Sequence, residues 1–142
     1  MKHATKMQVL VVSPESEMYS GEADMVFVKG ANGDLGIAPG HLQLLTSIKP
    51  GALRLQHGSN EELLYISGGI LEIQPDRVSI LADSLERPQD VNEAAALEAK
   101  RAAEEMLKGQ QGEFNRALVQ QALIEATAKL QVLELMRLRK TH

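Results

Sequence analysis

The stretch from Gly69 to Ala82, with the sequence GILEIQPDRVSILA, carries the pattern on which the fold depends. Its second half alternates between apolar and other side chains, which places Val78, Ile80 and Ala82 on one side of an extended strand. Pro75 interrupts the stretch, and proline sets the backbone angle that a tight turn needs at its second residue. We therefore predict two antiparallel strands joined by a hairpin turn, with one face of the pair buried.

Short strands of this kind are predicted through most of the chain, from Met7 to Leu85. The run from Glu22 to Lys29 alternates, and we expect Ala23, Met25 and Phe27 to share one face. Turn formers interrupt the chain about every ten residues, which is typical of a β-sandwich or a β-barrel. These turn formers are Asn32-Gly33, Pro39-Gly40, Pro50-Gly51, His57 to Asn60, Gly68-Gly69 and Pro75-Asp76.

The pattern changes after Pro88, where helical signals begin. Asp90 and Glu93 have the spacing of a capping box, so we expect Asp90 to cap a helix. The segment from Ala94 to Glu105 is rich in the strongest helix formers, and the glycines between 109 and 112 end it.

A second helix is predicted from Glu113 to Arg139, which makes the pair an antiparallel hairpin. The first helix offers mainly alanine to its partner, so the seam buries little area and we expect the hairpin to be mobile. The second helix has more apolar surface than this seam can cover, so it needs a further surface, either the strand domain or another protein. Its two apolar lines are Val119, Leu123, Ala126, Leu130 and Leu133, and Ala117, Ile124, Ala128, Leu135 and Leu138.

Composition excludes several classes of function. The chain has 142 residues and a net charge of -4, with two tyrosines, two phenylalanines and no tryptophan, which argues against binding nucleic acid. It has no cysteine, so disulfides, thiolate catalysis and cysteine-bound metal are excluded. The apolar run from Val9 to Val12 is too short for a signal peptide or a membrane span, so we expect a cytoplasmic protein.

No catalytic or cofactor-binding constellation is visible in the sequence. The phosphate-binding pattern G-x-x-x-x-G-K-[ST] does not occur, and the glycines at 30, 33 and 36 are best explained as a glycine-rich loop between strands. His41 and His57 lack the spacing of metal ligands. We therefore expect no cofactor, no metal and no enzymatic activity of the chain itself.

Three segments resemble the epsilon subunits of bacterial F-type ATP synthases, the counterparts of mitochondrial delta. The first, from Gly33 to Gly51, is similar to the family run G-[ED]-L-G-I-x-P-G-H-x-x-L-L-T-x-[IL]-x-P-G. The second, from Tyr65 to Pro75, resembles the family's SGG-hydrophobic-E-[VI]-QP hairpin. The third, from Val78 to Asp83, resembles its V-x-[IV]-L-A-D strand. The resemblance covers nearly the whole chain in the same strand-then-helix order.

This resemblance implies an all-β sandwich of about ten short strands over residues 1–88 and a regulatory two-helix hairpin over residues 89–142. It implies that the sandwich binds the gamma stalk and the c-ring, and so couples proton-driven rotation to ATP synthesis. The hairpin would lie folded on the sandwich, or extend toward the alpha and beta subunits of the catalytic head and restrain ATP hydrolysis. The protein would then lie peripherally on the cytoplasmic face of the bacterial inner membrane, as part of the synthase.

The resemblance also assigns partner contacts to one group of residues in the sandwich. These are expected at the end that faces the c-ring and gamma, and they are Gly33, Asp34, Leu35, Gly36 and His41. For His41 a hydrogen bond that stabilises a turn is the alternative role, with similar weight.

The basic end of the chain, with Arg137, Arg139 and Lys140, has two interpretations. Cations at a helix C-terminus interact favourably with the helix dipole, which is a sufficient explanation by itself. The resemblance favours the second interpretation, contact with an acidic surface of the catalytic head.

One departure from the family concerns ATP. Some relatives carry an [IL]-D-x-x-R-A motif at the first helix that is associated with ATP binding, and here Asn92 replaces the acid and Ala95 the arginine. Alanine cannot replace the planar guanidinium that pairs with phosphate, so we expect weak or absent ATP binding. Arg101 and Arg116 do not occupy the lost position.

Two other classes of function are open on the sequence alone. The chain could be a free-standing sandwich that binds a partner and self-associates through Val119, Leu123 and Leu130 of its hairpin. A small enzyme is disfavoured because catalytic groups are missing. Size-exclusion chromatography separates the first two classes, since a rotor subunit is expected to be monomeric when alone.

Overall fold

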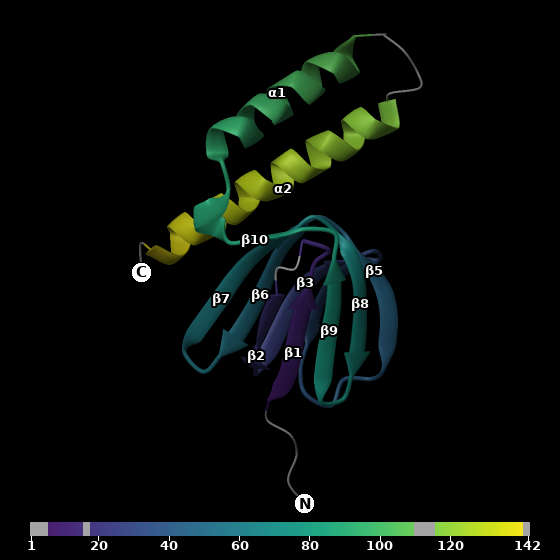
Figure 1. Cartoon of the computed structure of the whole chain (residues 1–142), viewed down its shortest axis with the longest axis vertical. Helices are drawn as coiled ribbons and strands as arrows, with labels where there is room; N and C mark the ends of the chain where they lie inside the picture. Colours follow the sequence, from purple (N-terminus) through teal and green to yellow (C-terminus); the bar gives the residue numbers. More distant parts are fainter. Residues whose placement is uncertain (1–5, 16–17, 110–115, 141–142) are drawn as a thin grey trace, which may run out of the picture.

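The computed structural model describes residues 6–15, 18–109 and 116–140. Within these ranges the chain forms ten strands, a short 3-10 helix and two α-helices (Figure 1). The strands are β1 (Met7–Val12), β2 (Met18–Ala23), β3 (Met25–Gly30), β4 (Gly33–Ile37), β5 (Leu44–Ile48), β6 (Gly51–His57), β7 (Asn60–Ile66), β8 (Gly69–Gln74), β9 (Arg77–Ala82) and β10 (Leu85–Glu86). The helical elements are η1 (Pro88–Asp90), α1 (Glu93–Lys108) and α2 (Arg116–Lys140).

The strands form one hydrogen-bonded sheet that folds over on itself. Its order is β10-β7-β6-β3-β5-β8-β9-β1-β2, with β4 paired to β3 off this path. β2 contacts β6 across the molecule, so the two ends of the order enclose a common core of Val, Leu and Ile side chains. The expected sandwich followed by a two-helix hairpin is confirmed.

The predicted hairpin in the second half of the sandwich is confirmed. β8 and β9 are antiparallel, and Gln74 pairs with Arg77 across the turn at residues 75–76. Val78, Ile80 and Ala82 are all buried in the core, as the alternation predicts.

The prediction of one continuous alternating strand from Glu22 to Lys29 is wrong, because the chain bends at Asp24. The Asp24 amide donates to the Gln56 carbonyl (2.6 Å), and its carboxylate accepts from the Gly58 amide (2.6 Å). These two bonds hold the bend against the β6–β7 turn and shift the alternation by one residue. As a result Val26 and Val28 enter the core, whereas Met25 and Phe27 lie on the outer face.

The expected glycine-rich loop after residue 30 is also wrong, because most of it is strand β4. A tight turn at residues 31–32 pairs Gly30 with Gly33, and the pairing continues as far as Val26 and Ile37. The turn predicted at Asn32-Gly33 is therefore present, but the residues after it continue as an ordered antiparallel ladder.

The first helix begins two residues later than the capping-box pattern indicates. Asp90 lies in η1, where Pro88 begins a short 3-10 turn. Asn92 is the N-cap of α1, and its side-chain oxygen accepts a hydrogen bond from the Ala95 amide (3.0 Å). An asparagine cap satisfies one of the free amides of the first helical turn, so Asp90 is not needed for this role.

The hairpin packs on the outer face of the sandwich. α1 contacts α2 through small side chains, with Ala96, Ala103 and Ala126 buried, which confirms the alanine seam. α2 contacts β6 and β7, so the further surface that it needs is provided by the sandwich (Figure 1). Neither of the two described α-helices is long and apolar enough to cross a membrane.

The apolar lines predicted on α2 are only partly confirmed. Of the second line, Ala128 is buried, whereas Ile124 and Leu138 are about half exposed. Val132, which neither predicted line included, is fully buried against the sandwich. The reason is that α2 meets the strands only through the half after residue 126, so its first half offers side chains to α1 and to solvent.

The junction between β7 and β8 provides a test of the packing. An alanine at Gly69 would place its methyl group 2.1 Å from the Leu81 carbonyl oxygen, at φ +146°. We expect Gly69→Ala to lower the free energy of unfolding by about 3 kcal/mol, from backbone strain and overpacking together. Gly58→Ala is the control, because φ is also positive there (+64°) but the space is open. It is expected to cost about 1 kcal/mol. Equal losses in urea unfolding would contradict the packing described for Gly69.

Candidate functional site

The second half of strand β7, from Leu63 to Ile66, is buried on both faces. Leu64 and Ile66 point into the core of the sandwich. Leu63 and Tyr65, on the opposite face, pack against α2 in a second apolar cluster. Their main partners on the helix are Ala128, Val132 and Leu133.

Tyr65 lies at the centre of the contact between α2 and β7, which we call the docking interface. Its side chain is fully buried, and its hydroxyl has no hydrogen-bond partner among the described residues. The Lys129 ammonium lies 5.5 Å from the centroid of its ring. Burial raises the pKa of the Tyr65 hydroxyl well above its ordinary value, and the carboxylates of Glu125 and Glu86 raise it further.

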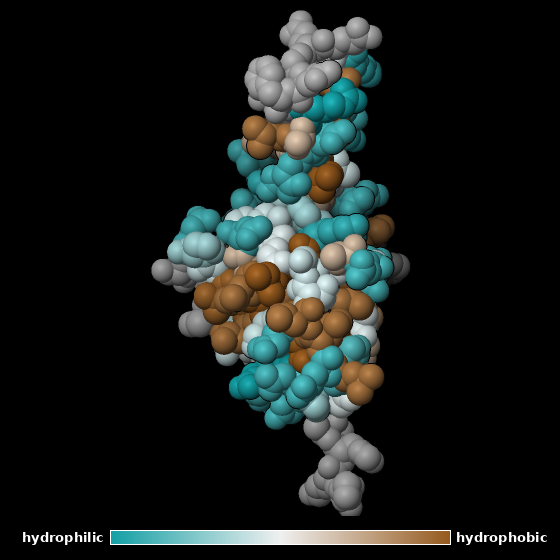
Figure 2. All heavy atoms as spheres, turned by 90° about the vertical axis from the view of Figure 1, so that its right-hand side faces the viewer, coloured by the Kyte–Doolittle hydropathy of each residue, from teal (hydrophilic) through white to brown (hydrophobic). Residues whose placement is uncertain are grey.

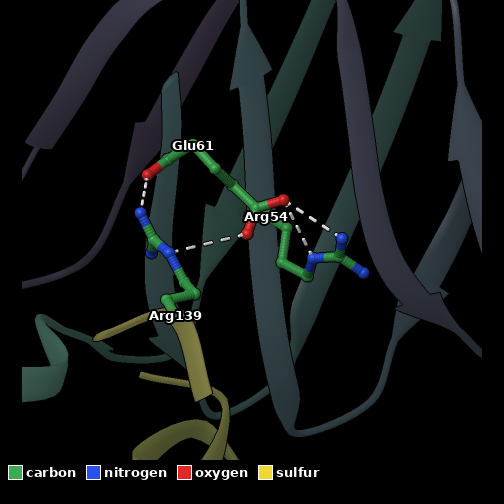
Figure 3. A network of polar contacts seen from close by, with 3 residues as sticks. All are labelled: Arg54, Glu61 and Arg139. Carbon is green, nitrogen blue, oxygen red and sulfur yellow. Dashed lines mark hydrogen bonds and ion pairs between the residues drawn. The ribbon is translucent and has the colours of Figure 1, made fainter. Parts of the chain in front are cut away.

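Polar contacts surround the apolar part of the interface. The Lys129 ammonium lies 3.7 Å from a Glu86 oxygen, and the Lys29 ammonium lies 3.4 Å from the Gln131 side-chain oxygen. Near the end of α2, Arg139 binds Glu61 of β7 (Figure 3). The hairpin is thus tied to the sandwich at three places.

A separate ion pair closes the hairpin itself. Arg137 near the end of α2 donates to Glu93 at the start of α1 (2.7 Å). This hydrogen bond lowers the pKa of the Glu93 carboxyl and raises that of the Arg137 guanidinium. Because both residues belong to the hairpin, the pair joins the two helices to each other and not to the sandwich.

A second candidate surface is apolar and lies away from the hairpin. Leu45, Ile70 and Leu81 are 70%, 50% and 61% exposed, and Ile70 is paired directly with Leu81 across β8 and β9. Leu10 of β1 lies on the same outer face and is 38% exposed. Figure 2 shows apolar residues gathered on this side of the sandwich. A group of exposed apolar side chains of this kind is a candidate surface for contact with another molecule.

Most of the length of the chain is similar to known proteins of one family. The model of the family described as "ATP synthase, Delta/Epsilon chain, beta-sandwich domain" matches residues 6–88. The model of its long alpha-helix domain matches residues 89–134. A protein named ATP synthase epsilon chain from Halorhodospira halophila is 50% identical over 135 residues, which is 94% of this chain and 96% of the relative. The chain belongs to the ATP synthase delta/epsilon family.

A second relative agrees with this assignment, and two solved structures share the fold. An ATP synthase epsilon chain from Acidithiobacillus ferridurans is 48% identical and covers 94% of this chain and 95% of its own length. A chain in the cryo-EM structure of the Euglena gracilis mitochondrial ATP synthase has the same fold, with a TM-score of 0.82 at 16% identity over 94% of this chain and 84% of that one. A central-stalk and c-ring structure from Tetrahymena thermophila gives a TM-score of 0.63 at 14% identity, over 94% and 99% of the two chains.

The residues that we expected together at one end of the sandwich are spread along β4 and the loop after it, with Gly33 at the start of β4 and His41 beyond its end at Ile37. Gly33 pairs with Gly30, Gly30 pairs with Ile48 at the end of β5, and Ile48 pairs with Gly69. Gly33 therefore lies level with the start of β8. His41 is level with the end of β8, where the neighbouring Gly40 amide donates to the Pro75 carbonyl (2.7 Å). β8 has six residues, so these positions are separated by about 20 Å.

The intervening residues line the free edge of β4. Asp34 and Gly36 are exposed, whereas Leu35 packs against the core. The His41 amide closes a turn by donating to the Ala38 carbonyl (3.1 Å), and its ring Nδ1 lies 2.7 Å from the carbonyl oxygen of the next residue. Their contacts with a partner stay predictions.

The basic end of α2 makes contacts within the chain. Arg137 and Arg139 pair with Glu93 and Glu61, and the side chain of Lys140 lies outside the described residues. The three half-buried residues of the self-association hypothesis, Val119, Leu123 and Leu130, lie on the helix that faces α1.

Of the two altered positions of the ATP motif, one stabilises the start of α1 and the other points to solvent. Asn92 caps α1 through its side chain, and Ala95 is exposed. A groove between the helices nearby is lined by Glu93, Leu97, Leu130, Glu134, Arg137 and Leu138. Its two carboxylates are unfavourable for a phosphate chain, and its arginine already pairs with Glu93. Across the described ranges, no group of three or more acidic or histidine side chains is placed to hold a metal.

Sequence reasoning missed the docking face and the exposed apolar face. The run Leu63-Leu64-Tyr65-Ile66 does not alternate, which is the signal of a strand buried on both sides. Ile70 and Leu81 occupy positions that alternation assigns to solvent, so their apolar character was a signal of a binding surface. The pairing of Glu61 with Arg139 spans 78 residues and left no local pattern.

Tyr65 provides a test of docking that depends on pH. In a Tyr19→Phe background it is the only tyrosine, and near-ultraviolet absorbance should show that it ionises well above the ordinary pKa of about 10. In a chain that ends after Arg87 its pKa should return toward that value, because α2 no longer covers the ring.

The sign of the effect on docking follows from this raised pKa. Below pH of about 10 Tyr65 is neutral in both states, and docking has its full stability. As the pH rises further, the undocked form loses its proton first and docking weakens. Tyr65→Phe should remove this alkaline loss. A Tyr65 that ionises near pH 10 in the whole chain would show that α2 does not cover it.

Proposed function

We propose that this chain is the non-catalytic epsilon subunit of the central stalk of a bacterial, proton-transporting F-type ATP synthase. Its sandwich, residues 1–88, binds the gamma subunit and the c-ring and couples rotation of the ring to ATP synthesis in the catalytic head. Its hairpin, residues 89–142, is regulatory. The observation that carries this proposal is the exposed apolar face of the sandwich, which lies apart from the docked hairpin and is open to a partner.

The apolar face suits a long-lived contact with the gamma subunit. Ile70 and Leu81 are adjacent, and their side chains are 50% and 61% exposed. Leu10 and Leu45 lie on the same face. Burying such side chains contributes about 25 cal/mol per Å² of apolar area, which favours a stable rather than a transient contact. We assign this face to gamma.

The edge of β4 is assigned to the c-ring side of the sandwich. Among the described strands β4 pairs only with β3, so its other edge is open to a partner. A partner that contacts both Asp34 and His41 must extend along this edge, because the two residues lie near opposite ends of it. Membrane association is then peripheral, through the complex, at the cytoplasmic face of the inner membrane.

The hairpin is proposed to leave the sandwich and reach the alpha and beta subunits, where it restrains ATP hydrolysis. Its interface with the sandwich is small in apolar content and contains a buried hydroxyl with no hydrogen-bond partner in the described part of the chain, so the docked and extended states can differ by only a few kcal/mol. The shifted pKa values belong to the two tyrosines, through burial, and to the ion pairs Glu98–Arg101 and Glu93–Arg137 of the hairpin, so each has a structural cause.

The proposal is tested by adding the chain to an ATP synthase head stripped of its own epsilon subunit. The whole chain is expected to bind and to inhibit ATP hydrolysis, and the chain that ends after Arg87 to bind without inhibiting. Leu81→Glu should weaken binding of both by at least tenfold, because it places a charge in the contact with gamma. In the whole chain, Leu97→Glu is the matched control, because it places the same charge on an exposed leucine of α1, away from the apolar face of the sandwich.

The outcomes separate the parts of the proposal. Binding without inhibition by either chain leaves a structural coupler whose hairpin has no braking role. Failure of both chains to bind would exclude the rotor assignment.

A second prediction concerns ATP. Titration calorimetry of the isolated chain with magnesium ATP should give no binding in the micromolar range, because Ala95 supplies no guanidinium and the adjacent groove is lined by Glu93 and Glu134. Ala95→Arg is expected to increase affinity by restoring a bidentate phosphate contact. Tight, specific binding by the unaltered chain would overturn this prediction.

A further inference from the structure

We propose that Glu61 is the receptor that holds the basic C-terminal turn of α2 on the sandwich, and that its contact with Arg139 sets the fraction of chains whose hairpin is docked. Only the consequence for the catalytic head rests on the proposed function. The docking balance is a property of the isolated chain, so the two can fail separately.

Glu61 is held in place by the sandwich itself. Arg54, diagonally opposite on β6, donates from Nε (3.3 Å) and Nη2 (3.1 Å) to Oε2 of Glu61. The Arg54 guanidinium in turn lies 4.8 Å from the centroid of the Phe27 ring. Contacts on both sides fix the arginine and hence the orientation of the carboxylate, which lowers the entropy lost when a further group binds it.

Arg139 uses the two acceptors of Glu61 that remain. Its Nη2 donates to the Glu61 main-chain carbonyl, and its Nε lies 3.8 Å from Oε1 (Figure 3). Glu61 thus lies between two arginines, one from the sandwich and one from the hairpin. The Glu61 side chain is 21% exposed and that of Arg139 is 42% exposed, so solvent screens the pair from the arginine side and we expect a contact of limited strength.

This contact lies beyond the apolar part of the interface. The fully buried contact of α2 is centred on Val132 and Tyr65, one to two helical turns before Arg139. Leu138, beside Arg139 in the sequence, is 54% exposed and adds little burial at this end. Of the other cations near the end of α2, Arg137 binds Glu93 and moves with the hairpin. Arg139 is therefore the described cation that ties the last turn of α2 to the sandwich.

Arg139 can bind Glu61 or a partner surface, but not both at once. While the hairpin is docked, its guanidinium is occupied by Glu61. When the hairpin extends, the same cation becomes available to an acidic surface of the catalytic head. Glu61 and that acidic surface then compete for one arginine, and strengthening either contact opposes the other.

The test measures docking in the isolated chain. Because the chain has no cysteine, cysteines placed at the exposed Ser20 and Glu104 can carry a donor and an acceptor dye whose energy transfer reports docking. Arg139→Gln is expected to lower the ratio of docked to undocked chains about two- to five-fold, the range measured for ion pairs of limited strength. Glu61→Gln should lower it similarly, and Arg139→Gln should have little further effect in the Glu61→Gln background.

Arg101→Gln is the matched control. It removes the same charge from α1, where the described partners of Arg101 are Glu98 and Glu105 of its own helix. It should leave docking unchanged. The proposal is overturned if Arg139→Gln docks as well as Arg101→Gln, or if the effects of Arg139→Gln and Glu61→Gln simply add. Urea unfolding of Glu61→Gln shows whether the sandwich is intact, and Arg139→Gln tests the proposal without altering the strands.

The competition is tested with the stripped synthase head. Glu61→Gln leaves Arg139 intact but releases it, so inhibition of hydrolysis should strengthen about two- to five-fold. Arg139→Gln should inhibit less than Glu61→Gln, because it removes the contact with the head as well. If docking shifts as expected but both variants inhibit equally, Glu61 still holds Arg139 in the docked state, and the contact of Arg139 with the catalytic head is refuted. If neither the chain nor its variants inhibit, the proposed regulatory function fails while the docking result is unaffected.

Discussion

The structure depends on one strand that is buried on both sides. β7 presents Leu64 and Ile66 to the core of the sandwich and Leu63 and Tyr65 to the hairpin. A side-chain period of two lets one strand serve two cores, provided that both faces are apolar. The sandwich therefore has a complete core without the hairpin, whereas α2 has a complete apolar environment only while it covers β7.

This asymmetry explains how a small protein can have a stable domain and a movable one. The contact between α2 and β7 combines favourable burial of Val132 with a set of half-exposed polar contacts and with a Tyr65 hydroxyl that none of the described residues hydrogen-bonds. An unsatisfied buried hydroxyl costs about 1–3 kcal/mol, which offsets much of the gain from a few buried aliphatic side chains. Regions with such contacts open at lower free energy than the core strands of the same protein.

Much of the fold could be predicted from local patterns. The hairpin at residues 75–76, the alternation of β9 and the alanine seam of α1 all follow from period and turn chemistry, and all are present. Contacts between distant segments account for the errors. The bend at Asp24 is set by bonds to Gln56 and Gly58, and these shift the phase of β3. The start of α1 depends on the competition between Asp90 and Asn92, which the capping-box spacing alone does not decide.

The candidate surfaces were less predictable than the fold. Which face of α2 meets the sandwich depends on where the helix crosses β6 and β7, so Val132 was missed although its neighbours were identified. Asp34 and His41 are close in sequence, but the extended β4 separates them.

Native-state hydrogen exchange can show whether the hairpin opens while the sandwich stays folded. The amides of α2 are expected to exchange through an opening of a few kcal/mol, well below that of the amides of β8 and β9, and this opening should not change with low concentrations of urea. A single opening free energy for α2 and the strands, equal to that of global unfolding, would show that the hairpin does not open separately from the sandwich.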